Sequence, residues 1–172
     1  MIGPLLVSAP AITICIEIAS SAWHAHCGKD SEKSVEKGCV MKKRVLVAED
    51  YEDIRRMMKI LLECRGYEVL EAADGYEAVN KAVSDNPDLI LMDIAMPVMD
   101  GLQATEAIRR HDDLADVPIV AVTAYGEFYS ERARNAGCND VIQKPLDFGS
   151  LEPIVEGYIA HDRSQAGGEA RV

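Results

Sequence analysis

Three absences limit what this chain can be. It has no excess of basic residues: the formal net charge is −11. That argues against a nucleic-acid backbone as the main partner, because phosphate binding requires Lys and Arg gathered on one face. Its five cysteines include no Cys-x-x-Cys pair, and the odd number argues against a disulfide framework. Cys64 and Cys138 lie within apolar patterns, so we expect both thiols to be buried in a reducing cytosol.

The chain also has no hydrophobic run long enough to span a membrane. Residues 2–22 are largely apolar, but Glu17 interrupts them, so no stretch of about 18 uncharged residues remains. No basic segment precedes this stretch, as a signal peptide would require. We therefore expect a cytoplasmic protein without membrane contact.

The first forty residues differ from the rest in composition. Residues 23–27 contain two histidines and a cysteine, but no second ligand cluster follows at zinc-finger spacing, so an accidental grouping is the simpler interpretation. Residues 29–37 are polar and charged, as in a linker. We interpret residues 1–40 as a disordered extension or a misassigned start, with Met41 as the true initiator. The intact mass of the protein made from its native locus would distinguish Met1 from Met41.

Five strand–helix repeats occupy residues 41–160. Short apolar strands are expected at 45–48, 67–72, 89–93, 118–122 and 140–143, each followed by residues with helical spacing. This alternation predicts an α/β fold, a doubly wound five-stranded parallel sheet with helices on both faces. The flavodoxin-like strand order 2-1-3-4-5 is the natural candidate. Residues 161–172 are rich in Gly, Ala and charge, and we expect a flexible tail.

Three carboxylates follow the ends of two expected strands. Glu49 and Asp50 come after the first strand, and Asp93 ends the third. In the expected order these strands are neighbours, so the carboxylates should lie together, where they repel unless a hard divalent cation lies among them. Magnesium prefers such oxygen ligands. The sequence therefore predicts a Mg²⁺ site, with the backbone carbonyl of Ala95 as a further ligand.

Two other strand ends supply a hydroxyl group and a positive charge. Thr123 ends the fourth strand, and Lys144 follows the fifth. An anion near Asp93 would then be held by the cation, the hydroxyl and the ammonium, which is what phosphoryl transfer requires. The nucleophile would be an Asp carboxylate, which forms an acyl phosphate.

Each of these residues has a simpler explanation when it is considered alone. Glu49 and Asp50 could cap the first helix. Asp93 could be a turn residue, Thr123 a structural residue, and Lys144 a solvated lysine. The joint pattern is much more specific, because four separate strand ends carry the residue types that a metal-assisted phosphoryl site needs.

With these motifs the chain resembles the receiver domain of two-component response regulators over roughly residues 42–160. The matching segments are Glu49-Asp50, Asp93, residues 96–101, Thr123-Ala124 and Lys144-Pro145. The resemblance implies that Asp93 is the phosphoacceptor and that Glu49, Asp50 and Asp93 hold Mg²⁺. It also implies that Thr123 and Lys144 contact the phosphoryl group, that the Lys144–Pro145 bond is cis, and that the donor is a histidine kinase or a histidine phosphotransfer protein.

Two positions depart from the pattern of that family. Val141 stands where members usually carry an aromatic residue that turns inward with the threonine, so no aromatic rotamer can report the switch here. Ala95 offers no amide or acid to orient a water, so we expect slow self-hydrolysis of the phosphorylated form. A half-life of seconds would contradict that expectation.

Because only a short stretch follows the last expected helix, we expect no output domain. We expect a regulator that is not an enzyme, works as a monomer or weak homodimer, and signals to a downstream protein by contact in a phosphorelay. A Mg²⁺-dependent aspartyl-phosphate phosphohydrolase is an alternative, although Ala95 replaces the second acid of haloacid dehalogenase-like enzymes. A flavodoxin-like cofactor binder is disfavoured, because Glu49 and Asp50 would repel a phosphate. A degenerate receiver acting as a protein-binding module is the remaining alternative.

Overall fold

The computed structural model describes residues 42–124, 126–146 and 148–165. The interpretations placed on residues 1–40, on Met41 as a start and on the tail beyond 165 lie outside the described residues. The strands are β1 (Arg44–Ala48), β2 (Glu68–Ala72), β3 (Leu89–Asp93), β4 (Ile119–Thr123) and β5 (Asp140–Gln143). The helices are α2 (Glu52–Cys64), α3 (Gly75–Asp85), α4 (Gly101–Arg109), the short 3₁₀ helix η1 (Asp112–Leu114), α5 (Gly126–Ala136) and α6 (Phe148–Gln165).

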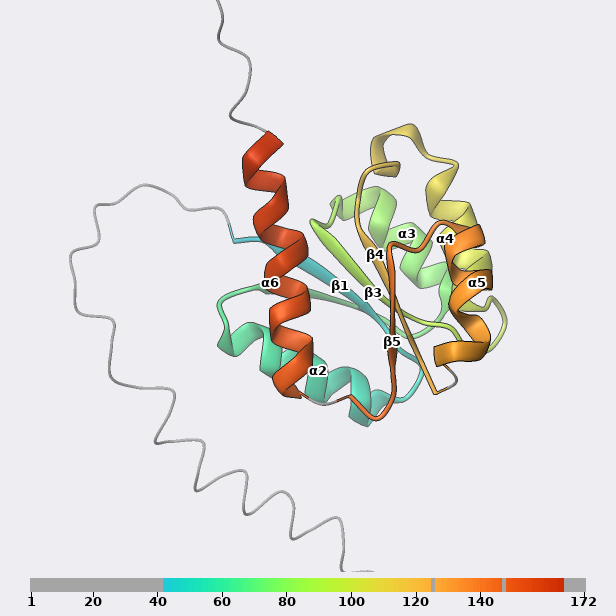
Figure 1. Ribbon diagram of the computed structural model, residues 1–172, viewed down its shortest axis with the longest axis horizontal. Coiled ribbons are helices and arrows are strands. Elements are labelled where there is room, and N and C mark those ends of the chain that lie inside the picture. The colour runs from blue at the N-terminus through green and yellow to red at the C-terminus, as the bar shows by residue number, and fades with distance from the viewer. Residues whose placement is uncertain (1–41, 125, 147, 166–172) are drawn as a thin grey trace, which may run out of the picture. The chain divides into compact units, whose positions relative to one another are not determined.

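The five strands form one sheet in the order β2-β1-β3-β4-β5, and every neighbouring pair is parallel (Figure 1). This confirms the predicted doubly wound fold. The order changes direction between β1 and β3, which lie side by side although β2 intervenes in the chain. Ligands of such sheets bind at the carboxyl ends of the strands on either side of this switch point.

The sheet separates two hydrophobic cores because successive side chains of a strand point to opposite faces. In β1, Val45 and Val47 pack with α2 and α6, whereas Leu46 and Ala48 pack with α3, α4 and α5. Burial on both faces explains why the central strands β3 and β4 are buried along their whole length. The rigid sheet therefore fixes the positions of the residues at its carboxyl edge.

Three local features differ from the expectations. The 3₁₀ helix at Asp112–Leu114 was not predicted, and α6 continues to Gln165, beyond the end expected near His161. The expectation that Cys64 is buried is wrong: Cys64 is exposed, whereas Cys138 is buried as predicted. Met58 and Leu62 form the buried face of α2. Cys64 lies two residues after Leu62, which is about half a helical turn away from that face.

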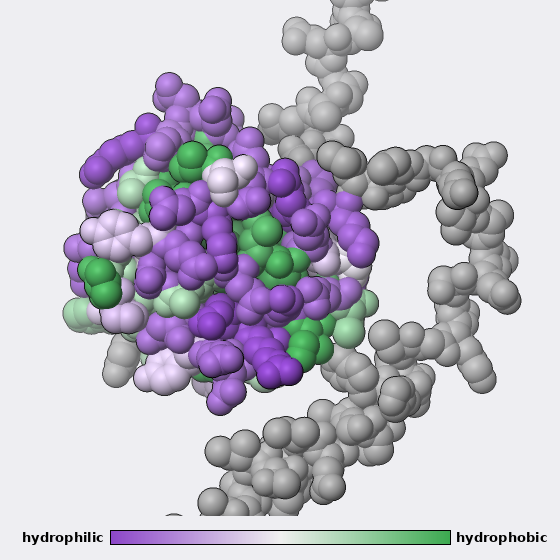
Figure 2. Space-filling model, turned by 180° about the vertical axis from the view of Figure 1, so that it is seen from behind, coloured by the Kyte–Doolittle hydropathy of each residue, from purple (hydrophilic) through white to green (hydrophobic). Residues whose placement is uncertain are grey.

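Most of the surface seen in Figure 2 is hydrophilic, with hydrophobic side chains in small separated groups. This agrees with the acidic composition of the chain. Among the helices that the structure describes, we find none with the length and apolar character needed to cross a bilayer.

Candidate functional site

The three predicted carboxylates meet at the carboxyl edge of β1 and β3. Glu49 directly follows β1, and Asp93 is the last residue of β3, one position beyond the partner of Ala48. Glu49, Asp50 and Asp93 each place one carboxylate oxygen within 4.8 Å of the others. Glu49 is 1% exposed and Asp93 is 3% exposed. The sequence therefore placed these acids together correctly, and the structure adds that two of them are almost inaccessible to solvent.

Lys144 lies at the same edge and contacts two of the acids. Its Nζ donates to Glu49 Oε2 at 2.7 Å and to Asp93 Oδ2 at 2.8 Å. The backbone holds Lys144 in place, because its N–H donates to the Thr123 carbonyl at 2.7 Å. The Lys144–Pro145 peptide bond is cis, as the resemblance implied. One ammonium thus serves two carboxylates, which leaves the cluster with a net negative charge.

Burial and mutual contact change the ionisation of this cluster. Burial raises the pKa of Glu49 above its ordinary value, and the negative charge of Asp93 raises it further, although the hydrogen bond from Lys144 lowers it. For Lys144, burial alone would lower the pKa, but the hydrogen bonds to Asp93 and Glu49 outweigh it, so the pKa is raised. The lysine therefore stays protonated across the physiological range.

Among the described residues, two buried carboxylate oxygens have no hydrogen-bond partner. Glu49 Oε1 and Asp50 Oδ1 are buried, and within the described part of the chain neither makes a hydrogen bond. A buried unpaired acceptor costs about 1–3 kcal/mol, and more when it is charged. A divalent cation with oxygen ligands would satisfy both atoms. The residues present thus fit a magnesium ion, because Lys144 does not occupy Glu49 Oε1 or Asp50 Oδ1.

The simpler explanation for Glu49 and Asp50, helix capping, does not hold. Tyr51 occupies the N-cap position of α2, and this cap makes no side-chain hydrogen bond. By contrast, Asp74 and Asp100 accept hydrogen bonds from the backbone of α3 and α4 in the usual capping geometry. The acids after β1 are therefore not required to cap the helix that follows them.

The loop after β3 fixes the orientation of Asp93. Asp93 Oδ1 accepts a hydrogen bond from the Ala95 N–H at 3.1 Å, so both carboxylate oxygens are held by donors. At Gly101 the loop returns so close that a Cβ would lie 2.1 Å from the Asp93 carbonyl oxygen, which explains the requirement for glycine there. Ala95 is exposed, and its carbonyl as a metal ligand stays a prediction.

Thr123 and Val141 lie where the sequence placed them. Thr123 ends β4 with 1% exposure, beside Gln143 of β5. Val141 is half-buried on β5 and packs against the core formed with α3, α4 and α5. The roles given to these two residues are not tested by their positions and stay predictions.

The sequence did not single out Arg55, which the structure brings to the site. Its guanidinium donates to the backbone carbonyl of Glu49 at 2.7 Å. The only signal in the sequence is a charged residue on the first turns of the helix that follows Asp50, and this does not distinguish Arg55 from its neighbour Arg56.

Comparison with known proteins agrees with this geometry. Residues 45–156 match the model of the response regulator receiver domain. The polar-differentiation response regulator DivK of Brucella anthropi is 36% identical over 120 residues, which cover 69% of this chain and 98% of the relative.

Solved structures show the same likeness. The receiver domain of a sensor histidine kinase from Pseudomonas aeruginosa, which has a magnesium ion in its active-site cleft, is 35% identical and superposes with a TM-score of 0.65 over 70% of this chain and 99% of that one. The chemotaxis protein CheY4 of Vibrio cholerae is 30% identical, with a TM-score of 0.66 over 69% of this chain and 99% of that one. The chain belongs to the response regulator receiver domains of two-component systems.

Proposed function

We propose that Asp93 accepts a phosphoryl group in a Mg²⁺-dependent reaction and that the phosphorylated domain signals through protein contacts. The observation that carries this proposal is the arrangement around Lys144. Its ammonium lies 2.8 Å from Asp93 Oδ2 and 2.7 Å from Glu49 Oε2. Glu49 Oε1 and Asp50 Oδ1 have no hydrogen-bond partner within the described parts of the chain. A buried nucleophile beside one cation and a ready set of metal ligands is suited to phosphoryl transfer.

Each residue has a distinct role in the proposed reaction. A carboxylate oxygen of Asp93 forms the new P–O bond while the P–N bond of a donor phosphohistidine breaks, and the electron pair of that bond returns to the imidazole. The Ala95 N–H and Lys144 hold the Asp93 carboxylate in one orientation. The Lys144 ammonium and the Thr123 hydroxyl are the protein groups that would contact the transferred phosphoryl oxygens.

Glu49, Asp50 and Asp93, with the Ala95 carbonyl, are the proposed magnesium ligands. When bound, the ion supplies positive charge for the phosphoryl oxygens. The unpaired oxygens of Glu49 and Asp50 support this assignment. The magnesium ion of the Pseudomonas aeruginosa receiver supports it further.

Membership of the family supports a proposal for the donor and the compartment. We place the exchange in the cytoplasm, with a histidine kinase or a histidine phosphotransfer protein as donor and a protein as the downstream target. In this role the chain is a phosphoacceptor that is switched by its modification, not an enzyme that releases product in successive turnovers. Phosphorylation would shift the domain between two conformations that the target distinguishes.

Intact mass after incubation with acetyl phosphate tests the proposal. With Mg²⁺, the full chain should gain one phosphoryl group; without Mg²⁺, or in Asp93→Asn, it should gain none. Asp53→Asn is a matched control, because Asp53 is an exposed aspartate on the first turn of α2. Modification of Asp93→Asn, or modification independent of Mg²⁺, would contradict the proposal. Repeated release of phosphate would instead favour a phosphohydrolase.

A further inference from the structure

Arg55 of α2 contacts the backbone of Glu49 and Asp50. We propose that Arg55 is a positioning residue, which holds the backbone of Glu49 and Asp50 in the conformation that binds Mg²⁺ and is itself held by Glu71 of β2. The inference rests on the proposed function, because it concerns the same magnesium site. It assigns a role to two residues that do not contact the ion.

The Glu49–Asp50 backbone is held from two sides. On one side, the Glu49 N–H donates to the Ala72 carbonyl at the end of β2, at 3.0 Å. On the other, Arg55 Nη1 donates to the Glu49 carbonyl at 2.7 Å and lies 3.4 Å from the Asp50 carbonyl. The Arg55 guanidinium therefore makes the side-chain contacts that join α2 to both carbonyls.

This support is needed because the segment carries repelling charges. Two carboxylates of adjacent residues face a third within 4.8 Å, and the side chain of Tyr51 at the α2 N-cap makes no capping hydrogen bond. A shift of this turn would carry Glu49 Oε1 and Asp50 Oδ1 away from a common centre. Magnesium demands near-ideal octahedral geometry, so its affinity is sensitive to such a shift.

The chemistry of the contact favours a positioning role. Arg55 donates to backbone carbonyl oxygens, whereas Lys144 donates to carboxylate oxygens. Arg55 thus adds a positive charge near the acids without occupying the oxygens that a metal ion would use. A guanidinium has five donors in a fixed planar geometry, so it can hold the carbonyls and also pair with a carboxylate.

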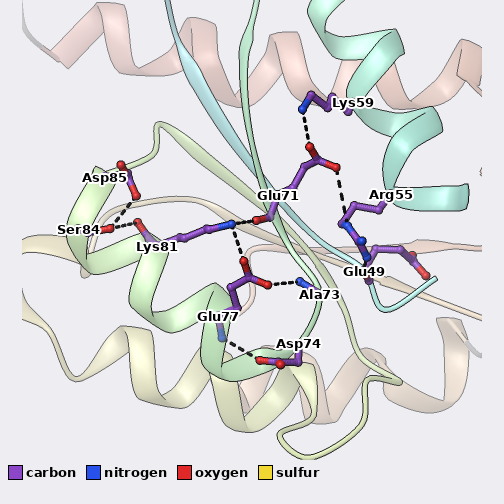
Figure 3. Close-up of polar contacts among 10 residues, drawn as sticks. All are labelled: Glu49, Arg55, Lys59, Glu71, Ala73, Asp74, Glu77, Lys81, Ser84 and Asp85. Carbon is purple, nitrogen blue, oxygen red and sulfur yellow. Dashed lines mark hydrogen bonds and ion pairs between the residues drawn. The ribbon is translucent and has the colours of Figure 1, made fainter. Parts of the chain in front are cut away.

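Glu71 is the carboxylate that pairs with Arg55 (Figure 3). Arg55 Nε lies 3.8 Å from Glu71 Oε1, and Lys59 contacts the other carboxylate oxygen of Glu71. The side chain of Arg55 is 16% exposed and that of Glu71 is 31% exposed, so the pair is partly shielded from solvent. Glu71 lies on β2 opposite Val47 of β1, so the pairing of these two strands positions it.

The network extends to the start of α3. Lys81 donates to the Glu71 carbonyl and pairs with Glu77 at 2.6 Å. Glu77 in turn accepts a hydrogen bond from the Ala73 N–H at 2.8 Å. The backbone carbonyl of Glu71, whose side chain pairs with Arg55, is thus itself held by Lys81, as Figure 3 shows.

The Mg²⁺ dissociation constant of the full chain, measured by isothermal titration calorimetry, tests the inference. Arg55→Ala should weaken binding about tenfold, since partners behind metal ligands typically contribute 10–100-fold. Arg55→Lys keeps the charge but loses the planar fork, so we expect an intermediate value. Arg56→Ala, at the exposed neighbouring arginine, should match the wild type. A dissociation constant of Arg55→Ala within about twofold of the wild type would overturn the inference.

A second readout separates positioning from a general structural role. The rate of phosphorylation by acetyl phosphate should need more Mg²⁺ in Arg55→Ala, with the maximum rate at saturating Mg²⁺ preserved. A lower maximum with an unchanged Mg²⁺ requirement would contradict the inference. If Arg55→Ala does not fold, Arg55→Lys and Glu71→Gln carry the test, and both should bind Mg²⁺ more weakly than the wild type.

The two proposals fail in different ways. A wild-type chain that binds no Mg²⁺, or that is not modified on Asp93, would contradict the proposed function. A wild-type chain that binds Mg²⁺ and is phosphorylated, beside an Arg55→Ala variant with unchanged Mg²⁺ affinity, would contradict only the role of Arg55.

Discussion

The amino and carboxyl ends of the parallel strands, here called the amino edge and the carboxyl edge of the sheet, differ in how completely their polar groups are hydrogen-bonded. At the amino edge, the Arg109 side chain donates to four acceptors. At the carboxyl edge, Glu49 Oε1 and Asp50 Oδ1 are buried and find no partner in residues 42–124, 126–146 and 148–165. The same fold thus satisfies polar groups fully where they stabilise it and leaves them unsatisfied where a ligand is to bind. Functional sites commonly reduce stability in this way.

The contacts at the amino edge show what full pairing looks like. The acceptors of Arg109 are the carbonyls of Gly137, Leu114 and Val117 and the side-chain oxygen of Asn139, all at 2.8–3.0 Å. Nearby, Asp88 accepts from the Lys43 side chain and from the Arg44 N–H, both at 2.7 Å. These bonds join the loops that lead into β1, β3, β4 and β5, so the edge is held by protein alone.

Replacement of Arg109 should have the largest effect on stability. Arg109→Ala leaves several partly buried acceptors without their donor, so the free energy of unfolding should fall by about 3 kcal/mol. Chemical denaturation followed by circular dichroism measures this, with Arg110→Ala at the exposed neighbour as control. The Mg²⁺ affinity should not change. A loss below about 1 kcal/mol, or a coupled loss of Mg²⁺ binding, would show that the two edges are not independent.

Added Mg²⁺ should stabilise the carboxyl edge by a similar amount. At about 100 times the dissociation constant, a ligand that binds only the folded state raises the free energy of unfolding by about 2.7 kcal/mol. Denaturation with Mg²⁺ and with a chelator measures the difference. Ca²⁺-free buffers keep the comparison to one ion. If the chelator leaves the stability unchanged, the unpaired oxygens of Glu49 and Asp50 are not metal ligands.

Removal of one charge at the carboxyl edge should stabilise the metal-free protein. Asp50→Asn relieves repulsion among three carboxylates, so we expect a gain of about 1 kcal/mol without Mg²⁺ and loss of most of the stabilisation by Mg²⁺. The sign is opposite to that of Arg109→Ala. Asp53→Asn on α2 should change neither quantity. An Asp50→Asn protein that is less stable without Mg²⁺ would show that this acid supports the fold.

Thiol labelling should show a smaller effect, a difference in reaction rate between an exposed and a buried cysteine. Cys64 is exposed at the end of α2, whereas Cys138 is buried near Arg109 and contacts Thr105 at 3.7 Å. Burial raises the pKa of the Cys138 thiol, which keeps it protonated and unreactive. Maleimide labelling mapped by mass spectrometry should modify Cys64 before Cys138, and Arg109→Ala should accelerate labelling of Cys138. Equal rates in the wild type would contradict the closed packing of the amino edge.

The sequence was sufficient for the fold and for the positions of the acids and the lysine. Apolar runs mark the strands, and parallel order brings their carboxyl ends to one edge, so Glu49, Asp93 and Lys144 could be placed without coordinates. The pairing inside the cluster could not, because it depends on side-chain conformations. Lys144 could have contacted one acid, both or neither.

The two arginines that support the edges illustrate the limit more clearly. Arg55 and Arg109 each belong to an Arg-Arg pair, with Arg56 and Arg110, and in both pairs one member is partly buried while the other is exposed. Arg55 donates to carbonyls of the sharp turn before its own helix. Arg109 donates to the Gly137 carbonyl, which lies 28 residues further along the chain. No periodicity in the sequence distinguishes such an arginine from its solvated neighbour.

Lys144 follows β5, the outermost strand on one side of the sheet, and is synthesised after the acids that it contacts. Lys144 lies 95 residues after Glu49 and directly follows β5, which is the last strand of the described sheet and pairs with β4. During synthesis the three acids emerge well before the cation that pairs with two of them, so the site is complete only when the last strand has joined the sheet. Edge strands also open more readily than central ones. A brief detachment of β5 would therefore withdraw the Lys144 ammonium from Glu49 and Asp93 before the domain itself unfolds.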